Sequence, residues 1–224
     1  MLTFQNLRLI GTSHIAKQSL ADVQSAFNEK IPKIVAIELD KNRLAALVSK
    51  QKHHPSIRDI AKVGINGWFF AVIAGWAEKK LGKMVGVAPG SEMLLAVKLA
   101  QMHKCTLALI DQDIAITLKR LSAQITWKEK WKFVGDILKA PFSRKKVPFD
   151  LRTVPGASLV KSLTTEMKKS YPNVYRVLVE ERNHLMAARL AKLIQQHPDD
   201  SILALVGAGH EREILRMVEK SIID

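Results

Sequence analysis

The chain has 224 residues, 47% of them hydrophobic and 25% charged, which is enough apolar content for a globular core and excludes extensive disorder. A net charge of +14 accompanies a single cysteine, and one cysteine excludes an internal disulfide and favours a reducing compartment. No secretory signal is visible and the longest apolar run is too short to span a membrane, so we expect a soluble, cytoplasmic chain.

The basic residues gather in three clusters, at 79–83, 127–132 and 144–146. None of them matches a helix-turn-helix, RRM or KH pattern, so a nucleic-acid partner is not expected. A solvated, lysine-rich surface is the simplest interpretation. Attraction to an anionic membrane surface is the alternative, because Trp127 and Trp131 lie one helical turn apart beside lysines.

Four short, continuous apolar runs predict buried parallel strands, because strands covered on both faces are apolar throughout rather than alternating. Helix-type sequence follows each run, which is the rhythm of repeated βαβ units. We therefore expect an α/β fold with a mainly parallel central sheet. The four runs are Leu7–Ile10, Ile34–Glu38, Thr106–Ile110 and Ile202–Val206.

The segment between the third and fourth predicted strands is too long for one crossover connection. Residues 114–196 read mostly as helices, broken near prolines. We expect a large helical insertion that overhangs the carboxyl edge of the sheet, within a single domain of residues 1–224.

A Gly-x-x-His tetrapeptide follows both the first and the last predicted strand, at residues 11–14 and 207–210. Glycine before the histidine suits a tight strand-to-helix turn. Ligands of parallel α/β sheets bind beyond the carboxyl ends of the strands, so we expect His14 and His210 to meet there. Two imidazoles alone are too few for a catalytic metal site, which usually takes three protein ligands.

Glu38 ends the second predicted strand and is a third candidate for the same crevice. Its carboxylate has the chemistry to ligate a divalent cation or to act as the base that activates water. The alternative is a structural role in a helix cap or salt bridge, although Asp40 suits the cap better.

The third strand leads into Asp111-Gln112-Asp113, and we expect only one of these two carboxylates to face the site. Arg120 follows two helical turns later and is placed to reach back toward Asp113. Further along, Glu181 and Arg182 open a predicted helix and are candidates for orienting the substrate.

Taken together, these residues resemble the TraB family, also called TraB/PrgY/GumN, which includes the Tiki proteins. Each motif alone is weak, but six of them in this order are specific, and they extend over nearly the whole chain. The motifs are Gly11-Thr12-Ser13-His14, Glu38-Leu39-Asp40, Pro89-Gly90-Ser91-Glu92, Ile110-Asp111-Gln112-Asp113-Ile114 with Thr117-Leu118-Lys119-Arg120, Glu181-Arg182-Asn183, and Val206-Gly207-Ala208-Gly209-His210.

The resemblance implies an α/β fold related to erythromycin esterase and ChaN-like proteins, with the paired Gly-x-x-His motifs and the strand-end glutamate in one active centre. Tiki proteins are membrane-tethered metalloproteases that use a divalent ion such as manganese or cobalt, and bacterial members are associated with the shutdown of peptide pheromone signals. By transfer, the metal and catalytic residues are His14, Glu38 and His210. The residues that support them are Arg120, Glu181 and Arg182.

The chain departs from the family at Gln112, where relatives often have an arginine. This departure removes a cation near the expected site.

We therefore expect a metal-dependent hydrolase that cleaves a peptide, with manganese or cobalt, or else zinc, lowering the pKa of a bound water. Two alternatives stay open. One is a metal-independent esterase on the same fold. The other is a non-enzymatic module that binds a peptide or an anionic membrane surface. A homo-oligomer is compatible with each of these.

Overall fold

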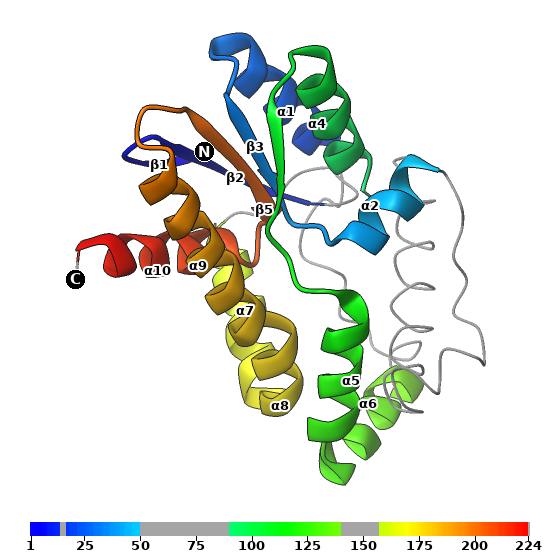
Figure 1. Ribbon diagram of the computed structural model, residues 1–224. Helices are drawn as coiled ribbons and strands as arrows, with labels where there is room; N and C mark the ends of the chain where they lie inside the picture. Colours follow the sequence, from blue (N-terminus) through cyan, green and yellow to red (C-terminus); the bar gives the residue numbers. More distant parts are fainter. Residues whose placement is uncertain (14–16, 50–89, 140–156, 224) are drawn as a thin grey trace.

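The computed structural model describes residues 1–13, 17–49, 90–139 and 157–223 (Figure 1). Five strands form one sheet in the order β1-β2-β5-β3-β4, and only the β1–β2 pair is antiparallel. The strands are β1 (Leu2–Phe4), β2 (Leu7–Thr12), β3 (Ile34–Ile37), β4 (Thr106–Leu109) and β5 (Ile202–Gly207).

All four predicted strands are confirmed to within two residues of their expected ends. The edge strand β1 was not predicted, because three residues of mixed polarity carry no periodic signal. It folds back onto β2 through a turn in which Gln5 has a φ of 48°, and no glycine marks that turn in the sequence.

Helices follow the strands as the βαβ pattern predicts, and further helices fill the interval between β4 and β5. In chain order they are α1 (Lys17–Glu29), α2 (Lys41–Val48), α4 (Ser91–Met102), α5 (Ile114–Gln124), α6 (Trp127–Lys139), α7 (Ala157–Ser170), α8 (Pro172–Tyr175), the π-helical turn η3 (Arg176–Glu180), α9 (Glu181–Gln196) and α10 (Glu211–Ile223). Among the described residues, every helix is too short or too polar to traverse a bilayer.

The sheet is covered on both faces (Figure 1). One face packs against α9 and α10, where Leu190 and Ile214 are fully buried. The other face packs against α1 and α4 through side chains such as Phe27 and Met93. This double cover explains why β3 and β5 are apolar at successive positions rather than at alternate ones.

The helices between β4 and β5 divide into two groups. Helices α5 to α8 pack around their own small apolar cluster, which includes Leu121, Ile125, Val174 and Val177. Figure 1 shows them beyond the end of the sheet, where α5 leaves β4. Helix α9 returns to the sheet and contributes to its core, so this long segment is anchored at both ends.

Gly11 lies inside strand β2 rather than in the expected turn, and its role is to leave space for a neighbouring side chain. A methyl group at this position would lie 2.8 Å from the Glu211 carboxyl and 3.2 Å from the Ala208 Cα. The Gly11 N–H donates to Glu211 Oε1 at 3.0 Å. The first Gly-x-x-His glycine therefore seats the start of α10 against β2.

Replacing Gly11 by alanine is expected to lower the free energy of unfolding by about 1–3 kcal/mol, because the methyl group would crowd the Ala208 backbone and break the hydrogen bond from the Gly11 N–H to Glu211. Gly135 in α6 provides a matched control, since a methyl group there meets no described atom within 4 Å. Gly135→Ala should raise the free energy by about 0.5–1 kcal/mol through helix propensity. Urea unfolding measures both values, and a Gly11→Ala variant as stable as the parent chain would contradict this account.

Candidate functional site

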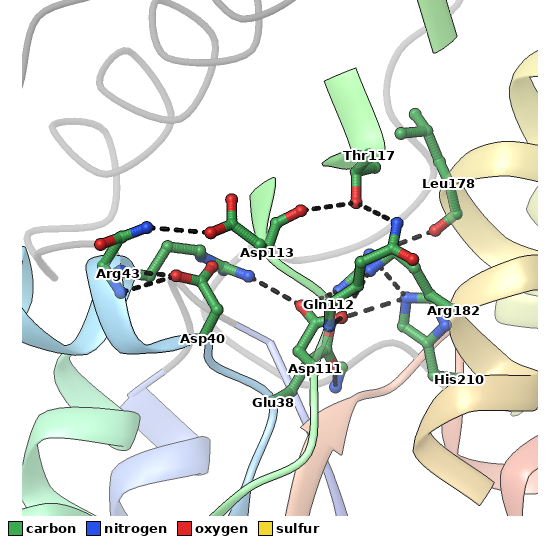
Figure 2. Close-up of polar contacts among 12 residues, drawn as sticks. Glu38, Asp40, Arg43, Asp111, Gln112, Asp113, Thr117, Leu178, Arg182 and His210 are labelled. Carbon is green, nitrogen blue, oxygen red and sulfur yellow. Dashed lines mark hydrogen bonds and ion pairs between the residues drawn. The ribbon is translucent and has the colours of Figure 1, made fainter. Parts of the chain in front are cut away.

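Four polar side chains from different parts of the chain converge at the carboxyl edge of the sheet (Figure 2). Glu38 directly follows β3, Asp111 follows β4, and His210 follows β5. Arg182 reaches them from the first turn of α9. Glu38 and Asp111 are buried, with exposed fractions of 2% and 4%. Two carboxylates are therefore shielded from water here, and cations or hydrogen bonds must compensate for the free energy lost with their hydration.

Arg182 provides most of that compensation. Its Nε donates to Asp111 Oδ1 at 3.0 Å and its Nη2 to Asp111 Oδ2 at 2.8 Å, and Nη2 also donates to Glu38 Oε1. Its Nη1 donates to the Leu178 carbonyl at 3.1 Å and lies 3.5 Å from His210 Nε2. Burial alone would lower the pKa of Arg182, but the two carboxylates outweigh this effect and raise it, so the guanidinium stays charged.

Two further arginines complete the surroundings of Asp111. Arg43 Nη1 donates to Asp111 Oδ2 at 3.0 Å, and Arg189 Nη1 donates to the Asp111 carbonyl oxygen at 2.6 Å. Arg43 is placed by helix α2, and Asp40 caps this helix by accepting from the N–H of Asn42 at 2.8 Å and of Arg43 at 3.0 Å. The expectation that Asp40 is a helix cap is confirmed.

Both oxygens of Glu38 are occupied. Oε1 accepts from Arg182, and Oε2 accepts from the Gly207 N–H at 2.5 Å. A methyl group at Gly207 would lie 3.4 Å from both Glu38 Oε2 and His210 Cδ2, which is ordinary contact. The second Gly-x-x-His glycine thus contributes its backbone N–H to the site.

His210 is oriented by an amide. Its Nδ1 lies 2.6 Å from Oδ1 of Asn183, a side chain with an exposed fraction of only 1%. An amide oxygen accepts only, so this contact places a proton on Nδ1, and in the neutral ring the lone pair is then on Nε2. That Nε2 lies 3.7 Å from Glu38 Oε1. The site therefore holds a fixed imidazole whose basic nitrogen faces a buried carboxylate.

The structure brings together only some of the predicted site residues. Glu38, Arg182 and His210 share one cluster, whereas His14 lies outside the described residues. Arg120 and Glu181 pair with each other, with Arg120 Nε 2.7 Å from Glu181 Oε2. They line a shallow cavity of about 470 Å³. Its other lining residues are Gln112, Arg176, Glu180 and His184.

Arg120 pairs with Glu181 instead of reaching back to Asp113, whose two oxygens contact α5 and Asn42. Asp113 Oδ1 caps α5 by accepting from the Ala115 N–H at 2.7 Å, and Oδ2 accepts from Asn42 Nδ2 at 2.9 Å. Of the two carboxylates after β4, only Asp111 faces the cluster, as expected, because the strand ends at Leu109 and Asp113 instead caps α5.

Sequence reasoning assigned no role to Asn183, Arg43 or Arg189. Asn183 follows Arg182 in the Glu-Arg-Asn motif, so the motif marked Asn183 as a candidate. It did not show that the side chain contacts His210. Arg43 lies one helical turn after the Asp40 cap and reads as an ordinary surface residue. Its partner Asp111 comes from another strand, and a single sequence does not pair them.

The imidazole tautomer gives a direct test of the Asn183 contact. In the parent chain, ¹⁵N NMR should find neutral His210 protonated at Nδ1, because Asn183 accepts that proton. Asn183→Ala should release the ring and shift the population toward the Nε2–H form. Asn42→Ala is the control, since Asn42 bonds to Asp113 and not to the histidine. Identical tautomers in the parent chain and Asn183→Ala would contradict the assignment.

Comparison with known proteins agrees with the motif order. The sequence model of the TraB/PrgY/gumN family matches residues 3–220. The chain is 33% identical over 216 residues to the uncharacterized protein MJ1365 of Methanocaldococcus jannaschii, which covers 96% of this chain and 54% of that protein. It is 27% identical to a mouse TraB domain-containing protein and 26% identical to a human one, in each case over 90% of this chain and 60% of the relative. The chain thus spans little more than half the length of these relatives, and it belongs to the TraB/PrgY/gumN family.

Proposed function

We propose that the protein is a hydrolase that cleaves an acyl bond of a peptide, with water activated beside His210. The observation that carries the proposal is the pair of half-buried His210 Nε2 and buried Glu38 Oε1, 3.7 Å apart, at the carboxyl edge of a parallel sheet. The geometry supports the acyl-transfer chemistry, and the peptide as substrate class follows from the family resemblance.

In the proposed step, a water molecule replaces the 3.5 Å contact of Arg182 Nη1 with His210 Nε2. Nε2 then accepts a proton from this water while the water oxygen bonds to the carbonyl carbon. The same proton is then returned to the leaving nitrogen as the carbon–nitrogen bond breaks, so the enzyme is regenerated. Asn183 keeps the opposite ring nitrogen protonated. The negative charge of Glu38 stabilises the imidazolium that forms between the two transfers.

Arg182 acts on the reaction through Glu38. Its guanidinium donors are directed at Asp111, Glu38 and the Leu178 carbonyl, and the remaining one points toward His210. A guanidinium with all its donors engaged is a poor substrate ligand, and its role in the proposal is to place a positive charge beside the buried Glu38 carboxyl group.

The expected divalent ion fits the described donors only in part. Two ligand atoms of one tetrahedral ion lie about 3.4 Å apart, and the 3.7 Å between His210 Nε2 and Glu38 Oε1 is close to that spacing. However, Arg182 already binds Glu38 Oε1, and its cationic Nη1 lies 3.5 Å from Nε2. The donors as arranged do not fit a metal, and no group of three candidate ligands occurs in the described part of the chain.

A manganese-, cobalt- or zinc-dependent reaction is the second candidate, because the family resemblance implies a divalent ion and the 3.7 Å between His210 Nε2 and Glu38 Oε1 is close to a ligand spacing. It needs Arg182 to leave Glu38 and needs a further ligand, for which His14 is the sequence candidate.

A relationship of the fold to erythromycin esterase and ChaN-like proteins is also part of the proposal. The mainly parallel sheet with helices inserted at its carboxyl edge supports it. A cytoplasmic location is a further part of the proposal, and the single cysteine favours it.

The activity test uses a library of short synthetic peptides read by mass spectrometry, with p-nitrophenyl esters as a second substrate class. His210→Gln and Glu38→Gln should each lower the rate by about 100-fold or more, because one removes the base and the other removes the charge beside it. Cleavage by the parent chain should persist in the presence of a chelator.

The control variants are His197→Gln and Glu29→Gln, which change the same residue types away from the site. They should retain the parent rate. Full activity in His210→Gln would overturn the proposal. Loss of activity with chelator, restored by manganese, would favour the second candidate. Turnover of esters but not of peptides would favour the esterase alternative.

A further inference from the structure

Helix α6 carries a surface that the proposed function does not use, here called the tryptophan–lysine face, formed by Trp127, Lys128, Trp131 and Lys132. Trp127 and Trp131 are 71% and 70% exposed, although tryptophan is usually among the more buried residue types. The spacing of four residues places the two rings side by side on the helix, and the two lysines form a parallel row next to them.

The orientation of this face is fixed by contacts on the opposite side of α6. Thr126 and Glu129 form a capping box, in which Glu129 Oε2 accepts from the Thr126 N–H at 3.0 Å. Glu129 also accepts from the Asn173 N–H at 2.8 Å, which ties α6 to α8. Glu129 is 4% exposed, and its burial sets which side of the helix faces outward.

Glu129 lies on the side of α6 opposite the two tryptophans, whereas Asp136 follows Lys132 by one helical turn in the row of lysines. Burial would raise the pKa of Glu129, but the hydrogen bonds from Thr126 and Asn173 outweigh burial and lower it, so this carboxylate stays ionised among its partners. Asp136 accepts from the hydroxyl of Tyr171. The outward face of α6 therefore combines apolar rings with positive charge.

The tryptophan–lysine face lies away from the Glu38–His210 site. Figure 1 shows the α5–α6 turn at the end of the molecule farthest from the sheet.

We propose that the tryptophan–lysine face docks on the surface of an anionic lipid bilayer. Indole rings favour the boundary between headgroups and acyl chains, and lysines beside them pair with anionic headgroups. Lys130 Nζ lies 4.4 Å from the centre of the Trp127 ring and adds a cation at the edge of the face. The net charge of +14 adds long-range attraction to such a surface.

A vesicle co-sedimentation assay with the full chain tests this proposal, using phosphatidylcholine vesicles with and without phosphatidylserine. The parent chain should bind only the vesicles that contain phosphatidylserine, and salt should weaken binding. The double variants W127A/W131A and K128E/K132E should each bind at least roughly tenfold more weakly, because one removes the interfacial anchors and the other reverses the headgroup contacts.

Two double variants serve as matched controls. Lys98→Glu with Lys192→Glu changes the same charge on exposed positions of α4 and α9, and Met102→Ala with Ile223→Ala removes apolar side chains that are 66% and 74% exposed. Both should bind more tightly than their α6 counterparts. Thermal unfolding at the parent temperature verifies the fold of each α6 variant.

Three outcomes would overturn the proposal. The first is equal binding to vesicles with and without phosphatidylserine, or no binding to either. The second is parent-like binding by either α6 double variant. The third is binding to RNA or duplex DNA oligonucleotides without binding to vesicles, which would assign the face to nucleic acid instead.

Discussion

The contact of the Arg182 guanidinium with the carboxylates of Glu38 and Asp111 is the interaction on which the carboxyl edge of the sheet depends. Strands β3 and β4 each deliver a buried acidic side chain to this edge, and two buried carboxylates without a cation would be strongly destabilising. The fold meets that constraint by returning the chain to the sheet as α9, which positions Arg182 between them. The adjacent Asn183 then orients His210 from the same turn of helix.

This constraint gives the segment between β4 and β5 two separate tasks. Helix α9 belongs to the core of the domain, where Leu190 packs against the sheet. The first turn of α9 contributes Arg182 and Asn183 to the site. Helices α5 to α8 pack on one another and have the freedom to carry a second surface, because the sheet does not dictate their outward residues. The tryptophan–lysine face of α6 occupies that second surface. The proposed chemistry thus lies at the carboxyl edge of the sheet, where α9 contributes Arg182 and Asn183, and the proposed membrane contact lies on α6.

The sequence predicted the sheet well because buried parallel strands are continuous apolar runs, and it placed Glu38 and His210 at one edge because parallel strands end together. It could not predict the charge pairing. Arg182 contacts Glu38 and Asp111 from a helix distant in the chain, and polar side chains on a helix carry no signal of their partner. Gly11 was also misread, since a glycine that admits Glu211 looks the same in sequence as one that permits a turn.

A double-mutant cycle between Glu38 and Arg182 tests the central claim most directly. The free energy of unfolding is measured by urea for the parent chain, Glu38→Gln, Arg182→Met and the combined variant. If Arg182 holds Glu38 ionised in the buried site, the two single changes will not add, and the coupling free energy will be about 2 kcal/mol or more. Single changes that add to within about 0.5 kcal/mol would contradict the account, because independent side chains behave that way.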